Sequence, residues 1–397
     1  MSARTFWSRR QFVQLISSSS AFGSVRALAP WLPGAGSEKT PATVKRATPR
    51  FAYIGCLGKT QGIYVFSIHG ERWTLRQVIA SNRPLSLALH PNQQFLYAVN
   101  AIDTYRSLPA GTIEAYSIDP QKGILTLLNR QPLSLSGIMP KHLAISPDGR
   151  NVVVAIHGGG AYNVLPIRAD GHLERVSGIV KETGSGPDRQ WQEAAHPHTV
   201  IFDTTGRYVL SSDLGSDRLN VFSWTDGKLI LRHRSTTTSG SGPAHLAMHP
   251  SGHLLYVLNK LDASIACYGY DAANGRMLER LHHVPTFSSD SQEQASADIL
   301  VIHPSGRFLY ASGYGKTNSV AMWSIDTSSG ALTPIQHMVD GLHFPSAMTI
   351  VPDGTSLFAM DKSSIVRMFV DPISGHLNQP VKMAEVPTPM SLAMKYL

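Results

Sequence analysis

The stretch Pro243-Ala-His-Leu-Ala-Met-His-Pro250, followed by Ser251-Gly252 and Leu254-Leu-Tyr-Val-Leu258, decides the fold of this chain. Two apolar runs are joined by a Gly-containing turn, which is the pattern of a β-hairpin. Repetition of this pattern indicates an array of similar β units rather than a set of unrelated domains. The theme occurs six times, and the other copies begin at Pro84, Pro140, Pro197, Ala297 and Pro345.

Each unit continues beyond its hairpin. A third apolar run follows, as in Gly111-Thr-Ile-Glu-Ala-Tyr-Ser-Ile118 and Ser319-Val-Ala-Met-Trp-Ser-Ile325, and then a glycine turn and a fourth run. Each unit is therefore predicted to be a four-stranded antiparallel meander. The 261 residues from Pro91 to Pro352 span five repeats, or about 52 residues per unit, which fits a β-propeller blade with loop insertions.

The two ends of the array complete each other. Phe51-Ala-Tyr-Ile-Gly-Cys56 matches a second strand with no first strand before it, and Pro389-Met-Ser-Leu-Ala-Met394 matches a first strand with nothing after it. A seventh blade built from both ends removes the exposed edges of an open array. We therefore predict an all-β, seven-bladed β-propeller over residues 50–397, with its ring closed by pairing of the C-terminal strand with the N-terminal strands.

The composition is that of a protein with a large core. Of the 397 residues, 42% are hydrophobic and 16% charged, against about 25% charged in an ordinary soluble domain, so intrinsic disorder is excluded as the main state. The two cysteines, Cys56 and Cys267, lie in apolar runs without CxxC spacing. We therefore expect buried thiols rather than a disulfide framework, a metal site or a redox centre.

The N-terminal segment has the order of an export signal. Ser8-Arg-Arg-Gln-Phe-Val-Gln14 is followed by a weakly apolar, serine-rich run and by small residues around Ala27 and Ala29. The paired arginines resemble those of a twin-arginine signal. We predict a signal peptide at 1–29, a linker at 30–49, the twin-arginine export machinery as a partner, and a periplasmic or extracellular mature protein. A disordered basic tail is the alternative.

Charge and hydropathy exclude two further classes. Residues 1–29 hold four arginines and no acid, so the formal charge falls from +8 to +4 without them. Because no basic run is interleaved with aromatic residues, we expect no nucleic-acid partner. No stretch reaches the 18 apolar residues of a membrane-spanning helix, so none is predicted in the mature chain.

Meander geometry predicts where side chains converge. The start of the first strand and the end of the second lie at the same end of each blade, and inner strands line the central channel. The histidines that precede prolines, His90, His249 and His303, lie at the opposite end and are interpreted as structural. The starts of first strands bring together His142, His196, His198, His245 and Asp298, and the ends of second strands His157, Asp213, Asn259, Lys260, Tyr314, Asp361 and Lys362.

Several motifs resemble one known family. Gly184-Ser-Gly-Pro-Asp188, His196-Pro-His-Thr199, Asp213-Leu-Gly-Ser-Asp-Arg218 and Gly242-Pro-Ala-His245 are similar to those of the seven-bladed propeller lactonases. That family includes bacterial propeller-type 6-phosphogluconolactonases and fungal muconate cycloisomerases, and the resemblance covers residues 50–397. It implies a lactone, phosphorylated or not, at the channel mouth.

The chain departs from this family at four places. Where this chain has Ala244 and Lys260, the family usually has arginine and glutamate, respectively. The family usually has Asn-Arg in place of Gly313 and Tyr314, and often arginine in place of Ser346. The absent groups are those expected to hold an anionic substrate and to move protons. The resemblance therefore implies a lactone hydrolase with an altered substrate.

The remaining polar residues suggest roles in lactone opening, which requires an activated water and a donor to the oxyanion. We expect His198 to be the base, His142 or His245 to be a second polar contact, and Asp213 or Asp298 to orient an imidazole. Alternatively, His198 only lines the channel and Asp213 only caps a loop. The expected substrate-binding residues are Lys141, His196, Asn259, Lys260 and Tyr314, with the two lysines replacing the missing arginines as cations.

No metal or cofactor is predicted, because no pair of candidate ligands has a diagnostic spacing. Gly158-Gly159-Gly160 lies between two strands and is interpreted as a tight loop rather than a phosphate cradle. Three functions remain open. They are an exported hydrolase for an unphosphorylated lactone, a non-catalytic propeller that binds a sugar acid, cell-wall fragment or protein, and a muconate-type cycloisomerase.

Overall fold

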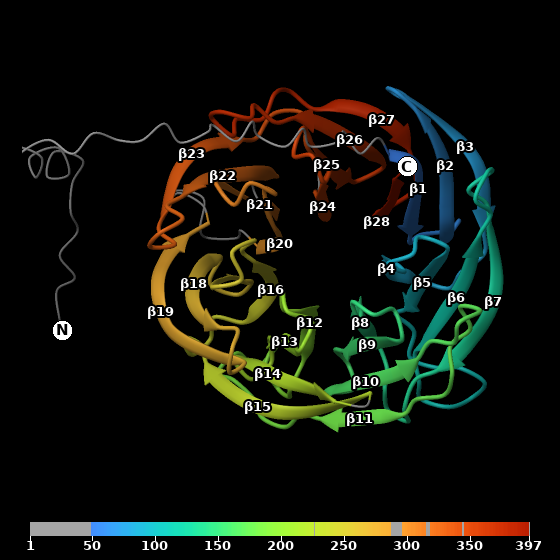
Figure 1. The fold of residues 1–397 in the computed structure, drawn as a ribbon, viewed down its shortest axis with the longest axis horizontal. Helices are drawn as coiled ribbons and strands as arrows, with labels where there is room; N and C mark the ends of the chain where they lie inside the picture. Colours follow the sequence, from blue (N-terminus) through green and yellow to red (C-terminus); the bar gives the residue numbers. More distant parts are fainter. Residues whose placement is uncertain (1–48, 226, 287–295, 315–317, 344, 397) are drawn as a thin grey trace, which may run out of the picture. The chain divides into compact units, whose positions relative to one another are not determined.

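The predicted propeller is confirmed. The computed structural model describes residues 49–396 apart from 226, 287–295, 315–317 and 344. The described residues form seven four-stranded antiparallel sheets, which stand as blades around a central channel (Figure 1). The predicted signal peptide at 1–29 and all but the last residue of the predicted linker lie outside the described residues.

Blades are numbered here along the chain, with strands given from the channel outward. Blade 1 contains β28 (Pro389–Tyr396), β1 (Pro49–Cys56), β2 (Gly62–His69) and β3 (Arg72–Ile79). Blade 2 contains β4 (Pro84–Leu89), β5 (Phe95–Asn100), β6 (Thr112–Ile118) and β7 (Leu125–Pro132). Blade 3 contains β8 (Pro140–Ile145), β9 (Asn151–Ile156), β10 (Ala161–Pro166) and β11 (Gly178–Lys181). Blade 4 contains β12 (Pro197–Phe202), β13 (Tyr208–Asp213), β14 (Arg218–Thr225) and β15 (Lys228–Thr236).

The last three blades repeat this order. Blade 5 contains β16 (Pro243–Met248), β17 (Leu254–Asn259), β18 (Ser264–Asp271) and β19 (Arg276–Pro285). Blade 6 contains β20 (Ser296–Ile302), β21 (Phe308–Tyr314), β22 (Ser319–Ile325) and β23 (Leu332–Met338). Blade 7 contains β24 (Ala347–Ile350), β25 (Ser356–Asp361), β26 (Ser364–Phe369) and β27 (Val381–Glu385).

The ring closes as expected, through the two ends of the repeat array. β28 pairs antiparallel with β1, with Met394 opposite Ala52 and Leu392 opposite Ile54. The inner strands of neighbouring blades contact one another around the whole ring. Blade 1 is therefore assembled from both ends of the described chain.

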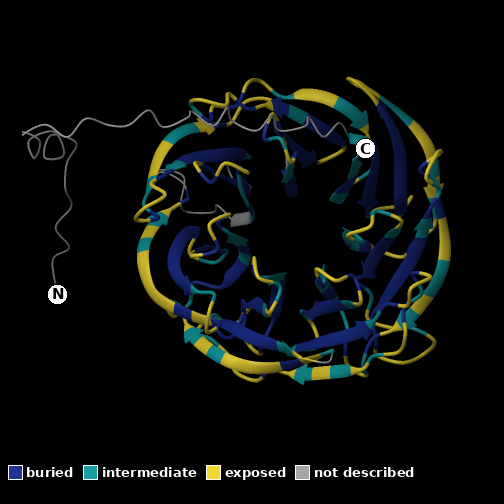
Figure 2. Ribbon diagram, viewed as in Figure 1, coloured by how far each residue is buried: buried dark blue, intermediate teal, exposed yellow. Residues whose placement is uncertain are grey.

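Burial explains why the blades need one another. The second and third strands are almost entirely buried, whereas the outer strands consist mostly of exposed and intermediate positions (Figure 2). Among the residues that the structure describes, seven hydrophobic clusters form the core, and each joins two adjacent blades. Between blades 2 and 3, for example, Tyr97 and Ile113 contact Leu143 and Val152. The two cysteines lie in such clusters as buried thiols, and burial raises the pKa of Cys56 to about 12 and that of Cys267 to about 11.

The histidines before proline are structural, as predicted. The Nε2–H of His249 donates to the carbonyl of Gly306 in the next blade at 2.9 Å, while its Nδ1 accepts from the Ser251 amide at 3.1 Å. Gly306 has φ of 74°, and a Cβ there would lie 2.5 Å from that Nε2, so only glycine fits the turn. His90 and His303 contact Gly149 and Gly354 in the same way.

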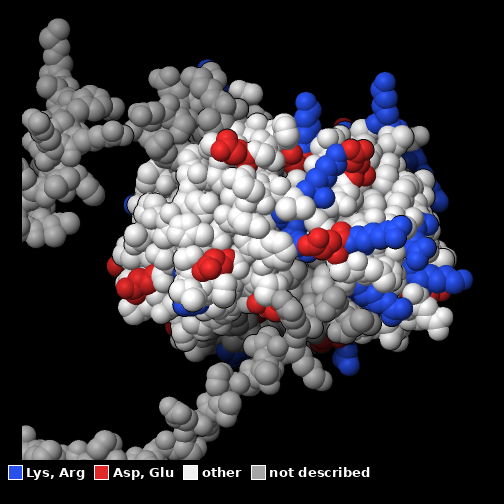
Figure 3. All heavy atoms as spheres, turned by 90° about the horizontal axis from the view of Figure 1, so that it is seen from above, with Lys and Arg blue, Asp and Glu red and all other residues white. Residues whose placement is uncertain are grey.

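The outer surface carries charges of both signs. On the face drawn in Figure 3, Lys and Arg side chains lie among Asp and Glu side chains and uncharged residues. This face therefore lacks the uninterrupted basic area typical of nucleic-acid binding.

Removal of the closing strand should unfold the ring. A chain that ends at Thr388 lacks β28, leaves the edge of β1 unpaired and exposes the apolar cluster between blades 7 and 1. We expect a loss of more than about 5 kcal/mol of unfolding free energy, which is the lower end of the stability of a native domain. Thermal unfolding followed by circular dichroism, together with size-exclusion chromatography, measures the loss.

A synthetic peptide of residues 389–397, added in trans, should restore part of the transition, because it can pair with β1. A truncated chain that melts like the full chain would contradict closure by β28.

Candidate active site

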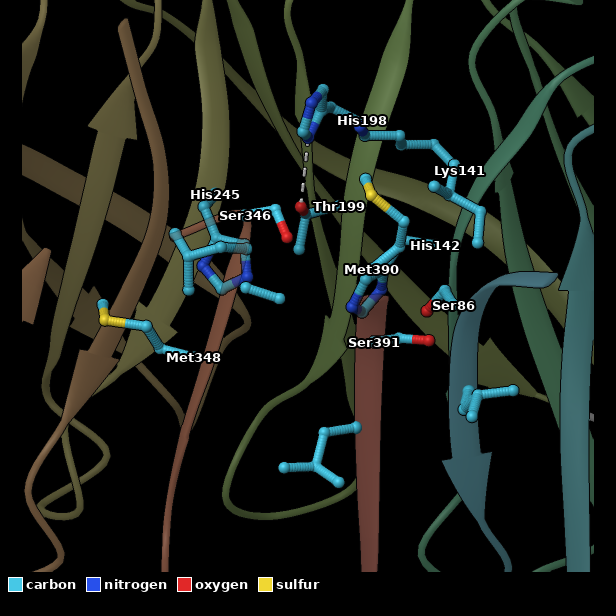
Figure 4. Close-up of a pocket in the computed structure, with 15 residues that line it drawn as sticks. Ser86, Lys141, His142, His198, Thr199, His245, Ser346, Met348, Met390 and Ser391 are labelled. Atoms are coloured by element: carbon cyan, nitrogen blue, oxygen red, sulfur yellow. Dashed lines mark hydrogen bonds between the residues drawn. The ribbon is translucent and has the colours of Figure 1, made fainter. Parts of the chain in front are cut away.

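A cavity of about 190 Å³ lies where the inner strands begin. Its polar wall consists of Lys141 and His142 from blade 3, His198 and Thr199 from blade 4, and His245 from blade 5 (Figure 4). Of the ten site residues predicted from the sequence, Lys141, His142, His198 and His245 line it. These four come from three consecutive blades and are brought together by the closed ring.

A break in strand pairing explains why neighbouring residues can share the cavity. In blades 2 to 5 the ladder skips the second residue of the inner strand, and in blade 6 it skips the third. In blade 3, for example, Pro140 pairs with Ile156 and His142 with Ala155, while Lys141 has no place in the register. Regular alternation would send Lys141 and His142 to opposite faces. A β-bulge of this kind re-aims one side chain, and both reach the cavity here.

The imidazoles lie close together. The rings of His142 and His245 are 6.4 Å apart and perpendicular, although their blades are not adjacent. The ring of His157, which directly follows β9, lies 6.0 Å from that of His198 and stacks on that of His196 at 4.5 Å. The Nδ1 of His198 lies 3.4 Å from Thr199 Oγ1 (Figure 4).

The rings of His142 and His245 have similar surroundings. The backbone of Val200 in the next blade raises the pKa of His142, and the backbone of Leu300 does the same for His245, in both cases against the larger effect of burial. Nδ1 of each ring is buried without a hydrogen-bond partner.

Burial keeps these imidazoles neutral. It lowers the pKa of His142 to about 4, with the Lys141 charge as the second cause. Burial lowers the pKa of His245 and of His157 to about 3 in each case. The pKa of His198 also falls well below 6.5, because of burial first and Lys141 second. At neutral pH the polar wall thus holds uncharged rings beside one ammonium group.

The contacts of Asp213 are those of the loop-capping alternative. Its Oδ1 accepts hydrogen bonds from the backbone amides of His196 at 2.7 Å, Gly215 at 3.1 Å and Ser216 at 3.2 Å. Burial raises the pKa of this carboxyl group. The turn after β13 leaves these amides without backbone partners, and Asp213 satisfies them. It therefore fixes a loop instead of orienting an imidazole.

The other predicted residues lie at the same end but outside the cavity wall. His196 contacts the His157 carbonyl and the Glu193 carboxylate through its two ring nitrogens, at 2.9 and 3.1 Å. Asn259 is buried and donates to Ser264 Oγ at 2.9 Å. Lys260 follows β17, and its charge contributes to the lowered pKa of His198.

For Asp298 and Tyr314 the structure places only the backbone. Asp298 lies in β20 at the skipped position, and Tyr314 pairs with Ser296 at the end of β21. Their side chains lie outside the described part of the chain. Gly158–Gly160 form the tight turn between β9 and β10, as expected.

The sequence analysis did not identify His343, a further histidine at this end of the ring. The buried carboxylate of Asp361 accepts from the backbone amide of His343 at 2.8 Å and contacts its Nδ1 at 2.9 Å, while the His343 side chain is 73% exposed. His343 lies in the loop before β24, where the repeat gives no position to compare. Only the placement of Asp361 at the end of a second strand could have pointed to it.

Two features are absent from the part of the chain that the structure describes. The described residues contain no group of three or more His, Cys, Asp or Glu arranged to hold a metal ion. They also include no helix with the length and apolar character needed to cross a membrane.

Comparison with known sequences supports one family. A family model described as "Lactonase, 7-bladed beta-propeller" matches residues 51–394. The chain is 27% identical over 350 residues to a 6-phosphogluconolactonase of Bacillus subtilis, which covers 86% of this chain and 97% of the relative. It is 30% identical over 346 residues to a 6-phosphogluconolactonase of Pectobacterium atrosepticum, which covers 85% of this chain and 96% of the relative.

Solved structures agree. A putative 6-phosphogluconolactonase of Bacteroides fragilis matches with a TM-score of 0.79 at 26% identity, covering 90% of this chain and 100% of the other. A periplasmic gluconolactonase of Pseudomonas aeruginosa has the same fold, with a TM-score of 0.79 at 24% identity over 87% of this chain and 98% of the other. With seven blades, a matching family model over nearly the whole ring and these relatives, the chain belongs to the seven-bladed β-propeller lactonase family.

Proposed function

We propose that this protein hydrolyses the lactone of an unphosphorylated sugar acid in the channel cavity, and that it acts after export from the cytoplasm. The observation that carries the hydrolase proposal is the meeting of three neutral imidazoles and the Lys141 ammonium in one cavity of a lactonase-family propeller. Relatives named 6-phosphogluconolactonase support a lactone as the substrate.

In the proposed reaction His198 is the general base. It removes a proton from a water molecule as the water oxygen attacks the lactone carbonyl carbon, and the tetrahedral oxyanion forms beside Lys141. The carbon–oxygen bond of the ring then breaks and the imidazolium returns its proton to the ring oxygen. The product is the hydroxy carboxylic acid, which releases its carboxyl proton to solvent and leaves as the carboxylate. Neutral His198 is ready to accept a proton at pH 7, because its pKa is held below the usual range.

In this reaction the Lys141 ammonium acts on both the base and the oxyanion. Its positive charge lowers the basicity of His198 in the free protein. Once negative charge develops on the lactone oxygen, the same ammonium stabilises it. The transition state thus gains an interaction that the free protein does not have.

The small number of cationic groups in the cavity supports an unphosphorylated substrate. Among the described residues that line it, Lys141 is the only one with a cationic side chain. At Ser346, where the family often has arginine, the hydroxyl lies in the cavity wall and donates to the Pro389 carbonyl at 2.8 Å. Phosphate is typically held by a bidentate arginine or by several cations. Lys141 alone would have to bind the phosphate and also stabilise the oxyanion.

Replacement of the base or the ammonium should abolish most of the activity. We expect His198→Ala to lower kcat for glucono-δ-lactone by about 10²-fold or more, and Lys141→Met by about 10²-fold, as for loss of an oxyanion donor. Exposed His253, in the turn at the opposite end of blade 5, provides the control His253→Ala, which should retain full activity. Initial rates of acid release, corrected for spontaneous ring opening, measure the effect.

Normal turnover by His198→Ala would show that the base has been misassigned. A protein that binds lactones without turning over any of them would instead be a non-catalytic binding propeller.

The pH profile should reveal a buried base. A base with a pKa well below 6.5 stays neutral, and therefore active, as the pH falls through 6.5. We expect kcat/KM to remain near its neutral value down to about pH 5, since neighbouring rings have pKa values of about 4 and about 3. Stopped-flow rates from pH 4 to 8 test this, and an acid limb near pH 6.5 would assign the base to an imidazole outside the cavity.

The export proposal rests on Ser8-Arg-Arg-Gln-Phe-Val-Gln14. Replacement of both Arg9 and Arg10 by lysine should retain the protein in the cytoplasm with residues 1–29 uncleaved, because the paired arginines are the recognised element of a twin-arginine signal. Cell fractionation and N-terminal sequencing measure the outcome. Equal export of both chains would contradict this route.

A further inference from the structure

The cavity has a second wall of opposite character. It is formed by inner strands of blades 1, 2, 6 and 7, whereas the histidines come from blades 3 to 5 (Figure 4). Six of its side chains are large and apolar, namely Leu85, Leu87, Ile299, Met348, Met390 and Leu392. The two walls therefore offer a ligand two chemically distinct sides.

The apolar wall has little hydrogen-bonding capacity of its own. Of its hydroxyl groups, that of Ser346 already donates to the Pro389 carbonyl. Ser86 and Ser391 remain, and the Ser391 hydroxyl is buried without a partner. A ligand group with several hydroxyls or a full charge would lose more hydrogen bonds to water than this wall could replace.

The opposite wall is polar. Lys141, His198 and Thr199 line it together with the rings of His142 and His245. The Lys141 ammonium can donate to a carbonyl oxygen of a ligand, and the neutral His198 ring and the Thr199 hydroxyl can form hydrogen bonds with its hydroxyl groups. This wall therefore suits the hydroxylated edge of a lactone ring, whereas a hydrocarbon edge would offer these groups no hydrogen bond.

We infer that the substrate is an amphipathic lactone, with its carbonyl and hydroxyl groups on one edge and a short hydrocarbon substituent on the other. A 6-deoxyhexono-lactone is the simplest compound of this class. The inference rests on the proposed function, since it names the substrate class of the same cavity. The volume of about 190 Å³ accommodates one ring with a short substituent, given that an engineered cavity of about 150 Å³ holds benzene.

The methionines suit this role. Met348 and Met390 come from neighbouring blades 7 and 1, and both line the cavity at its apolar wall. Thioether side chains are unbranched and polarizable, so they adapt to irregular apolar groups. A phosphate at this wall would meet sulfur and methyl groups instead of cations.

A series that differs at one substituent tests the inference. Three hexono-δ-lactones of one ring configuration carry at C6 a hydrogen, a hydroxyl or a phosphate, and their kcat/KM values are compared with the wild-type protein. We expect the 6-deoxy compound to exceed the 6-hydroxy compound by about tenfold or more, and the phosphorylated compound to be the poorest. A preference for the hydroxyl or the phosphate would overturn the inference and leave the hydrolase proposal intact.

Hydrolysis of none of the three lactones would instead refute the hydrolase proposal. The two failures are therefore distinguishable in one experiment, which does not depend on the folding of any variant.

A substitution locates the preference at the apolar wall. Met390→Gln should reduce the ratio of 6-deoxy to 6-hydroxy kcat/KM at least threefold, and Met348→Gln provides a second variant at the same wall. The control Leu127→Gln changes an exposed residue of outer strand β7 and should leave the ratio unchanged. An unchanged ratio in both methionine variants would contradict recognition by this wall.

Discussion

Each blade of this propeller is apolar on both faces, and that constraint governs the rest of the molecule. A blade cannot bury its two faces alone, so stability resides in the seven clusters between neighbours. An open row of blades would leave two apolar faces in water. Pairing of β28 with β1 removes both, and the closed ring then fixes inner strands from distant parts of the sequence around one axis.

The polarity of the cavity follows from two local features of the inner strands. The break in pairing after each leading residue lets consecutive side chains such as Lys141 and His142 share the channel. Packing of the ring then buries the imidazoles and keeps them neutral. The result is one cation surrounded by uncharged donors and acceptors, an environment that stabilises negative charge only when a substrate develops it.

Much of the fold could be predicted because the repeat is visible in the residues themselves. Six hairpin copies and the complementary ends at Phe51 and Pro389 were sufficient for the architecture and its closure. The histidine wall also followed, since polar residues stand out at inner-strand positions that otherwise repeat. The apolar wall did not, because Leu85 and Met390 look like ordinary strand residues until bulges turn them toward the channel. The loop-capping role of Asp213 depends on amide directions in the turn after β13, which spacing alone does not determine.

One position near the start of each inner strand has a further consequence. These seven sites, one in each blade, are Leu85, Lys141, His198, Ala244, Asp298, Ser346 and Met390. In blades 1 to 6 the site is skipped in the strand register, and in blade 7 it precedes β24. A change at one of them leaves the hydrophobic contacts of the other blades in place. Natural or laboratory selection can thus change the chemistry of the cavity one blade at a time. Such changes have little effect on the stability of the ring, because the contacts between the other blades remain.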